Sequence, residues 1–396
     1  MASLAILGSG FISDFYVQTL QGYRSKDRVI IAHSRDELRL KKFCGRHGIP
    51  NFTTTMEEAI SHPEVDLVVI GLPNYLHKEA VLLSVKHKKG VLCTKPLGRN
   101  YSEALEMMKA VEEAGVFNGY LEDLVYTPKT VMSIDNIRNG SIGKVIWARS
   151  RETHPGPHSD WFWDKELAGG GAILDLACHC IEIARSFIGK EIRPVEAMCW
   201  AATQVKPIEA EDHAIGLVKY SNGAIGQFEV SWTFRGGLDL RDEVMGTEGT
   251  IWLNHFLRTG FELFTTSEKK GYVSEKSESQ KGWLFPVGDE KVDLGYVNMF
   301  TDMLNAWEEK KRPVETFYDG MVVNAIMDAC LLSAKTKKWE PIVIEDWRGE
   351  MDSPKDSFKQ EYDADHFLVK IEKLQDGSKK IILQEKRTGK ISQRVE

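Results

Sequence analysis

The 396-residue sequence has no apolar run close to the roughly 20 residues needed to span a bilayer. We therefore expect no membrane-spanning segment. Basic residues are not in excess, because the formal net charge is -7 and no basic stripe offsets it. A nucleic acid is for this reason not expected as the main partner.

Cysteine is scarce and irregularly spaced. The sequence has six cysteines, and their spacing is not that of a disulfide framework. This pattern predicts reduced thiols and a cytoplasmic location. The opening MASLAILGSG has no charged segment before its short apolar run, so we expect it to form a first strand and not a signal peptide.

What the sequence does contain is typical of a folded protein with more than one domain. Apolar residues make up 42% of it and charged residues 28%. Over residues 1–120, short β-branched runs alternate with helical patterns, as in RVIIAHS before DELRLKKFCGRHG. This alternation predicts the α/β class: a Rossmann domain with a doubly wound parallel sheet.

The pattern changes over residues 121–348. Strand-like segments such as KVIWARSRET, HAIGLVKYS and AIGQFEVSWTF are separated by NG and GTEG turns, and helical patterns return at GYVNMFTDMLNAWEEKK and GMVVNAIMDACLLSAKTKK. We expect an α+β domain with a mostly antiparallel sheet. Residues 349–396 predict a polar linker and a hairpin about Asp376-Gly377, which we expect to cover a sheet edge or form a subunit contact.

The stretch GSGFIS follows the first predicted strand and precedes a helix. Gly8 and Gly10 would let the backbone turn tightly and approach a pyrophosphate, which the helix N-terminus would stabilise. The small Ser13 takes the place of a third glycine. The stretch predicts a dinucleotide site that includes Phe11 and Ile12; the alternative is a plain tight turn.

The end of the second predicted strand bears on the choice of dinucleotide. Ser34 and Arg35 stand where NAD enzymes often carry an acid. A hydroxyl and a guanidinium suit the 2′-phosphate of NADP(H), but Asp36 is close enough to serve NAD(H). Both cofactors stay open, and the local chemistry slightly favours NADP(H). Arg35 could also be a solvated charge that opens a helix.

The stretch GGGAILDLACHC places Asp175 and His179 four residues apart in an apolar segment. Titratable groups are costly to bury unless they are paired or used, so the stretch predicts either a catalytic pair or a satisfied core pair. Cys178 and Cys180 flank the histidine. Ligands this close on one helix point around it and not to one centre, so we predict no metal.

With GSGFIS, GLPNYLHKEA, CTKPLG and GGGAILDLACHC in this order, residues 1 to about 348 resemble the glucose-fructose oxidoreductase and inositol dehydrogenase (Gfo/Idh/MocA) family. The resemblance implies a Rossmann domain followed by a domain on a large open sheet, whose far face packs in homo-oligomers. It also implies oxidation or reduction of a sugar hydroxyl with NAD(H) or NADP(H), which we expect to be tightly bound.

The resemblance extends to single residues. Lys95 matches the family's catalytic lysine, and Asp175 and His179 match the pair that handles substrate hydroxyls. We hypothesise that His179 takes the hydroxyl proton, that Asp175 orients its ring or holds a neighbouring hydroxyl, and that Lys95 stabilises the developing alkoxide.

Other positions of the resemblance concern the cofactor and the pocket. Pro73, Asn74 and His77 match a loop that lies near the nicotinamide. Thr94 replaces the usual Glu before the lysine, which leaves open how this end of the cofactor is held. Tyr126 stands where many relatives carry Arg, and we expect it to contact substrate.

The stretch HPGPHSDWFW is a candidate substrate wall. His154 and His158 could bind hydroxyls, and Trp161 and Trp163 could stack on sugar rings or flat aglycones. The alternative is a stiff loop whose tryptophans fill the core between the domains. Four further residues could also reach the pocket: Arg149, Arg151, Asp212 and His213.

The segments GYLEDLVYTPK, RETHPGPHSDWFWD and CTKPLG are similar to a branch of bacterial enzymes that oxidise the C3 hydroxyl of glucosides. The leading hypothesis is an NAD(P)-dependent oxidoreductase that converts a glucoside, O- or C-linked, into a 3-keto sugar and so initiates deglycosylation. A second is an NAD-dependent glycosidase that oxidises C3 transiently. A third is a sensing protein without catalysis.

Overall fold

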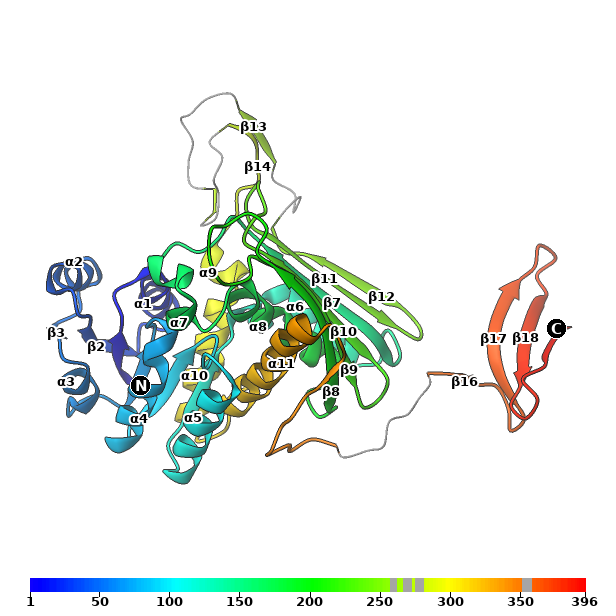
Figure 1. The fold of residues 1–396 in the computed structure, drawn as a ribbon, viewed down its shortest axis with the longest axis horizontal. Helices are drawn as coiled ribbons and strands as arrows, with labels where there is room; N and C mark the ends of the chain where they lie inside the picture. The colour runs from blue at the N-terminus through cyan, green and yellow to red at the C-terminus, as the bar shows by residue number, and fades with distance from the viewer. Residues whose placement is uncertain (257–261, 266–272, 275–280, 351–357) are drawn as a thin grey trace.

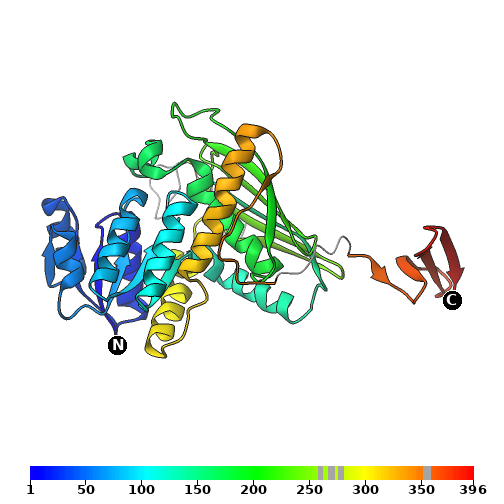
Figure 2. The ribbon, with the colours of Figure 1, turned by 60° about the horizontal axis from the view of Figure 1, so that its bottom comes forward.

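The computed structural model describes residues 1–256, 262–265, 273–274, 281–350 and 358–396. Figure 1 shows a small parallel sheet near the N-terminus, a larger curved sheet beside it and a third sheet at the C-terminus. The first two pack together through helices, whereas the third lies apart from them in both views (Figures 1 and 2).

The N-terminal sheet is parallel throughout and has the order β3-β2-β1-β4-β5-β6. Its central strands are almost fully buried because helices cover both faces, which explains their continuous apolar sequences. This confirms the predicted Rossmann fold. The strands are β1 (Ser3–Leu7), β2 (Arg28–His33), β3 (Asn51–Thr53), β4 (Leu67–Ile70), β5 (Gly90–Thr94) and β6 (Asn118–Leu121).

Five helices connect these strands. The side chain of Asp36 caps α2, and that of Asn100 caps α5, each by accepting a backbone N–H in the first turn. The helices are α1 (Phe11–Tyr23), α2 (Glu37–His47), α3 (Met56–Ser61), α4 (His77–Lys86) and α5 (Tyr101–Glu113).

The larger sheet has the order β12-β11-β7-β10-β9-β8-β15. Every neighbouring pair is antiparallel except β7 and β10, so the sheet is mixed and mostly antiparallel, as expected. Buried and exposed residues alternate along β9, because one face packs on helices. The strands are β7 (Val145–Thr153), β8 (Pro194–Ala202), β9 (His213–Tyr220), β10 (Ile225–Ser231), β11 (Asp239–Gly246), β12 (Thr250–Asn254) and β15 (Glu340–Pro341); β13 (Leu263–Thr265) and β14 (Gly282–Leu284) form a separate hairpin.

Helices α8 and α11 cover the inner face of this sheet and join it to the Rossmann part (Figure 2). Helix α11 also packs on α5, and α10 packs on α1, so late segments of the chain complete the N-terminal core. The pattern of the sequence did not predict this return. The helices are α6 (Pro128–Arg138), α7 (Lys165–Ala168), α8 (Cys178–Ile188), α9 (Glu290–Asp293), α10 (Tyr296–Glu308) and α11 (Phe317–Thr336), with a π-helix over Ile173–Ala177.

Two helical stretches are long and apolar enough to cross a membrane by length and composition, contrary to the expectation from the sequence. They are Lys165–Ile188 and Phe317–Thr336, and 89% and 72% of their apolar windows are buried inside the protein. Burial of this extent is what core helices of a folded domain show, because their apolar side chains contact protein on all sides.

The predicted hairpin about Asp376-Gly377 is confirmed and belongs to a four-stranded antiparallel sheet. The sheet stands away from the rest of its own chain in Figure 1, so it covers no edge there, and a subunit contact stays a prediction. Residues 351–357 of the predicted linker lie outside the described residues. The strands are β16 (Gln360–Glu361), β17 (His366–Lys373), β18 (Lys379–Glu385) and β19 (Ile391–Val395).

Candidate active site

A cavity of about 970 Å³ lies where the carboxyl ends of the parallel strands meet the second domain. This is where open parallel sheets bind ligands. Most of the residues predicted for the site line it: Gly8, Gly10, Phe11, Ile12, Ser34, Arg35, Pro73, Asn74, Thr94, Lys95, His154, His158, Trp161, Asp175 and His179.

The glycine turn at one end of the cavity fits a dinucleotide pyrophosphate. Gly8 has φ +110°, and a Cβ there would lie 2.3 Å from the carbonyl oxygen of Gly71, so only glycine fits. The first turn of α1 follows directly, and no side chain caps it, which leaves backbone N–H groups for an anion. Ser13 is fully buried beneath this turn, so a small residue is needed there.

The adenosine end of the cavity lies at the end of β2. The carboxylate of Asp36 accepts the backbone N–H of Arg39 at 2.9 Å, so it serves as a helix cap. The guanidinium of Arg39 donates to the carbonyl of Ser9 at 3.1 Å, and that of Arg35 donates to the hydroxyl of Tyr75 at 2.8 Å. The guanidinium groups of Arg35 and Arg39 therefore lie near Asp36, whose carboxylate already caps α2.

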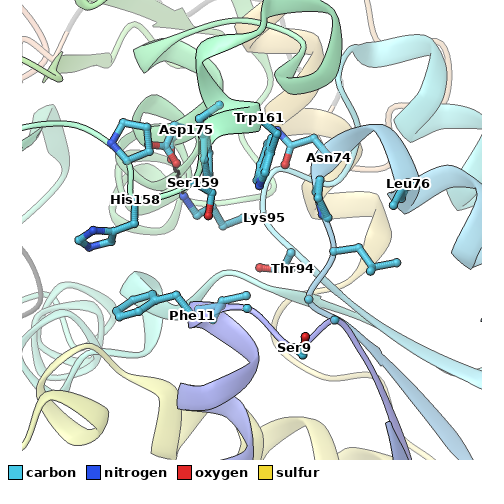
Figure 3. A pocket seen from close by; sticks show the side chains of 18 of the residues that line it. Ser9, Phe11, Asn74, Leu76, Thr94, Lys95, His158, Ser159, Trp161 and Asp175 are labelled. Atoms are coloured by element: carbon cyan, nitrogen blue, oxygen red, sulfur yellow. Dashed lines mark hydrogen bonds and ion pairs between the residues drawn. The ribbon is translucent and has the colours of Figure 1, made fainter. Parts of the chain in front are cut away.

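Lys95 and Asp175 form an ion pair in the wall of the cavity, as Figure 3 shows. The Lys95 ammonium donates to Oδ1 of Asp175 at 2.9 Å and to its backbone carbonyl at 2.6 Å. The indole N–H of Trp232 donates to Oδ2 at 2.9 Å. Both carboxylate oxygens are thus engaged by partners other than His179, and the predicted alternative that Asp175 orients the imidazole is not what the structure shows.

His179 is paired instead with Glu122, a residue that the sequence did not single out. Nδ1 of His179 and Oε1 of Glu122 share a hydrogen bond, and both residues are almost fully buried. Glu122 follows β6 directly, and His179 lies in the first turn of α8, so the pairing arises only when α8 packs at the end of the parallel sheet. No spacing in the sequence could have indicated it.

Burial shifts the pKa values around this pair. It raises the pKa of Glu122 to about 8 and that of Asp123 to about 7. Burial, assisted by the charge of Lys95, lowers the pKa of His179 to about 3, so its imidazole is neutral near pH 7. Burial also lowers the pKa of Lys95, but the charge and hydrogen bond of Asp175, together with Cys178 and Glu152, hold that pKa well above its ordinary value.

A third carboxyl group in the lining, Glu152 on β7, was also missed. Burial raises its pKa well above the ordinary value, although Lys95 opposes the shift. It is 7% exposed, and its Oε2 has no hydrogen-bond partner among the described residues. A buried neutral carboxyl of this kind can donate a hydrogen bond as well as accept one.

Aromatic rings also line the cavity. The rings of Phe11 and His158 lie 5.1 Å apart, and Figure 3 shows them facing each other below Asp175. Trp161 stacks on Phe162 with 3.7 Å between ring centres. Flat apolar surfaces of this kind suit sugar rings and aromatic groups.

The structure does not bring three of the predicted residues into the cavity lining. The ring of His77 is fully buried, and its two nitrogens contact backbone carbonyls, among them that of Leu72 at 2.9 Å. The hydroxyl of Tyr126 donates to Asp302 at 2.7 Å within the core. Trp163 packs edge-on against Trp232, as in the alternative of a tryptophan that fills the core.

The structure also shows the surroundings of five further residues, of which Thr94 lines the cavity and the other four do not. The hydroxyl of Tyr16 donates to Thr94 Oγ1 at 2.8 Å, which fixes the residue that replaces the usual Glu. Arg149 and Arg151 pair with Glu229 on the sheet instead of reaching the cavity. Asp212 accepts three backbone N–H groups of a turn, and neither it nor His213 lines the cavity.

In the described ranges, two groups of side chains have potential ligand atoms close enough together to hold a metal ion. In the first, Glu122, Cys178 and His179 lie within 4.8 Å of one another, and the hydrogen bond of the Glu122–His179 pair accounts for this. In the second, Glu182, Glu315 and Asp319 surround the ammonium of Lys190, which lies 2.9 Å from Glu182 and 3.3 Å from Asp319. A lysine therefore already occupies the second position, and the predicted absence of metal stays a prediction.

The cavity thus joins a backbone cradle for a dinucleotide to a wall that holds an ammonium, an imidazole and buried carboxyl groups. Proteins with this arrangement are dinucleotide-dependent oxidoreductases. Residues 2–120 match the oxidoreductase family with an NAD-binding Rossmann fold, and residues 135–252 match the GFO/IDH/MocA C-terminal domain. The chain belongs to the GFO/IDH/MocA family and is an enzyme that uses NAD.

Several known proteins are similar to it. Levoglucosan dehydrogenase of Pseudarthrobacter phenanthrenivorans is 26% identical over 79% of this chain and 88% of its own. The 1,5-anhydro-D-fructose reductase of Ensifer adhaerens is 33% identical over 53% of this chain and 63% of its own. The structure of GenD2 from gentamicin A biosynthesis in complex with NAD covers 87% of this chain and 97% of its own, with a TM-score of 0.81 and 28% identity.

Proposed function

We propose that the protein oxidises a secondary hydroxyl of a glucoside or related pyranoside, at C3, and yields a 3-keto sugar. The observation that carries this proposal is the presence of Lys95, Asp175 and His179 in one wall of the cavity that begins at the glycine turn. Support for the substrate class comes from relatives named for levoglucosan and 1,5-anhydro-D-fructose, both of which are cyclic sugar derivatives.

The side chains divide the work of alcohol oxidation. The neutral imidazole of His179 accepts the hydroxyl proton. Lys95 stays protonated, so it donates a hydrogen bond to the same oxygen and stabilises the developing alkoxide. Asp175 holds the ammonium in place through two acceptor atoms, and Trp232 fixes the carboxylate from the other side. A bound oxidised nicotinamide supplies the hydride acceptor.

NAD is the cofactor in this proposal, and Gly8, Gly10 and the first turn of α1 would hold its pyrophosphate. Ser34 and Arg35 lie at the adenosine end, where they also suit a 2′-phosphate, so NADP is a second substrate for the same site. The dinucleotide binds tightly and exchanges between turnovers, so that reduced nicotinamide accumulates as sugar is oxidised.

The aromatic wall is where the glycoside's aglycone binds. The rings of Phe11, His158 and Trp161 line the cavity, and those of Phe11 and His158 lie 5.1 Å apart. The resemblance of the segment 151–164 to glucoside C3 oxidases supports the same assignment. Glycosides with a flat aglycone, O- or C-linked, are the class that this wall fits best.

A panel of glucosides with NAD tests the proposal. The expected product has a carbonyl at C3, which NMR of the sugar ring locates, and reduced nicotinamide forms in equal amount. A carbonyl at another ring carbon overturns the C3 assignment. Absence of any reduced nicotinamide with every glycoside overturns the function.

Two other functions remain open to experiment. An NAD-dependent glycosidase would oxidise C3, eliminate across C1–C2, add water and then reduce the sugar again. Net release of nitrophenol from a nitrophenyl glucoside without added cofactor would favour it. A protein that only senses sugar or cofactor would bind them and show no turnover of any glycoside.

We also propose that the outer face of the large sheet joins copies of the chain into a homo-oligomer. Trp200 and Ile215 are neighbours on this face, and Trp252 on β12 is 75% exposed. Large apolar side chains on an open sheet favour self-association. Light scattering of the wild type and of Trp200→Asp tests this, and a monomeric wild type contradicts it.

A further inference from the structure

The hydrogen bond between Glu122 and His179 connects the cavity to a carboxyl group that the cavity does not reach. His179 lines the cavity, whereas Glu122 is fully buried behind it. Since Nδ1 of His179 is engaged by Glu122, the other ring nitrogen, Nε2, is the atom that can meet a substrate. Nε2 has no hydrogen bond to any residue in the described part of the chain.

The pair holds one proton in one of two ways. When Glu122 is ionised, Nδ1–H of His179 donates to it, and Nε2 carries a lone pair that can accept a proton. When Glu122 is protonated, its O–H donates to Nδ1, and Nε2 then carries the hydrogen and cannot act as a base. The protonation state of Glu122 thus selects the tautomer of His179.

We propose that Glu122 is a positioning residue of the oxidation: it takes the Nδ1 proton of His179 while Nε2 accepts the hydroxyl proton of the substrate. The substrate O–H and the His179 Nδ1–H bonds break, and Nε2–H and Glu122 O–H bonds form. The C–H hydrogen leaves with its electron pair as hydride, which the NAD of the oxidoreductase accepts. The inference rests on the proposed role of His179 as base.

The environment of the pair explains why the proton goes to the carboxyl. A charged imidazolium would be costly here, since burial and the nearby Lys95 lower the pKa of His179 to about 3. Burial raises the pKa of Glu122 to about 8, so it can hold a proton near neutral pH. The titratable and charged groups that face the pair from the elements around it are Lys95, Asp123, Glu152, Asp175, Cys178, Glu182 and Lys190.

The test compares Glu122→Gln with wild type, using 4-nitrophenyl β-D-glucoside and NAD. In the wild type, kcat/KM for oxidation falls as pH decreases through about 8, because Glu122 becomes protonated. This fall is the acid limb of the pH profile. The glutamine cannot take up a proton, so we expect the acid limb to disappear and kcat to fall about 100-fold with little change in KM. A Glu122→Asp variant, whose carboxyl can still titrate, should keep the limb.

Glu182→Gln is the matched control, because it also removes a buried carboxylate from this core. The charge of Glu182 raises the pKa of Glu122, so its removal should move the limb to lower pH and preserve it. An unchanged limb in Glu122→Gln overturns the proposal, whether or not kcat falls, because it assigns Glu122 a structural role only.

A second measurement needs no turnover. Infrared spectra of the NAD-bound protein should contain, at pH 6, the band of a buried protonated carboxyl that weakens at pH 9, because Glu122 loses its proton between these values. Glu122→Gln should lack this band at pH 6, and Glu182→Gln should retain it. Absence of this band from the wild type contradicts the role of Glu122 directly. If the band is present but no glycoside is oxidised, the proposed function fails and the pairing of Glu122 with His179 stands.

Discussion

The ammonium of Lys95 lies 2.9 Å from a carboxylate oxygen of Asp175 and 2.6 Å from the backbone carbonyl of the same residue. One side chain thus binds both the main chain and the side chain of its partner, which restricts its position far more than a single ion pair does. The ion pair joins the end of β5 to the helical segment of the second domain.

Because this ammonium is fixed and charged, Lys95→Ala should lower kcat/KM for oxidation about 100-fold or more through loss of alkoxide stabilisation. NAD should still bind, since the glycine turn is unchanged. Steady-state kinetics and NAD titration measure the two effects. Lys206→Ala is the control, because Lys206 lies over Trp163 outside the cavity, and equal losses in both variants would contradict the role of Lys95.

Gly8→Ala should weaken NAD binding about tenfold or more. The new Cβ would lie 2.3 Å from the carbonyl oxygen of Gly71, and the φ of +110° is costly for alanine. Gly48→Ala is the control: Gly48 also has a positive φ, but nothing lies within 4 Å of a Cβ there. Isothermal titration with NAD measures the difference, and equal affinities of the two variants would refute this account of the turn.

Ser34→Asp should raise the ratio of NAD to NADP efficiency. Asp36 is engaged as a helix cap, so a carboxylate at position 34 would supply the missing acceptor for the ribose hydroxyls and repel a 2′-phosphate. Values of kcat/KM with each cofactor measure the ratio, and we expect at least a tenfold change. An unchanged ratio would mean that Ser34 does not face the ribose.

Asp123 should make the stability of the protein depend on pH. Burial raises its pKa to about 7 in the folded state, whereas an unfolded chain loses this proton near pH 4. The native state binds more protons between these values, so the free energy of unfolding should fall as pH rises from about 4 to about 7.

Asp123→Asn removes this titration. The fall in the free energy of unfolding between about pH 4 and about pH 7 should therefore be smaller than in the wild type, by on the order of a few kcal/mol. Denaturant unfolding at several pH values checks it. Asp135→Asn, at an exposed position on α6, is the control and should leave the slope of the wild type unchanged. Glu122 and Glu152 also have raised pKa values, so some slope should remain; a slope in Asp123→Asn as steep as that of the wild type would contradict the role of Asp123.

The sequence predicted the parallel sheet and the glycine turn because both depend on local pattern. Continuous apolar strands, each followed by a helix, indicate a sheet buried on both faces, and Gly8 needs its φ whatever lies beyond. The residues that line the nucleotide part of the cavity follow from that local geometry.

Contacts between domains were not predictable in the same way. Glu122, Glu152 and Trp232 carry no spacing signal. They meet the Lys95–Asp175–His179 wall only because β7, β10 and the short helical turn after β6 (Asp123–Tyr126) are packed around α8. His77 shows the reverse case, since a position carried over by resemblance is here fully buried against backbone carbonyls.

The π-helix over Ile173–Ala177 gives the chain one more residue per turn than an α-helix at this point. Asp175 lies inside it and His179 just after it, which explains how two residues four positions apart address different partners, Lys95 and Glu122. A single-residue deletion that restored regular α-geometry would turn one of the two away from its partner. The geometry of this one turn therefore determines that Asp175 pairs with the lysine and that Glu122 pairs with the imidazole.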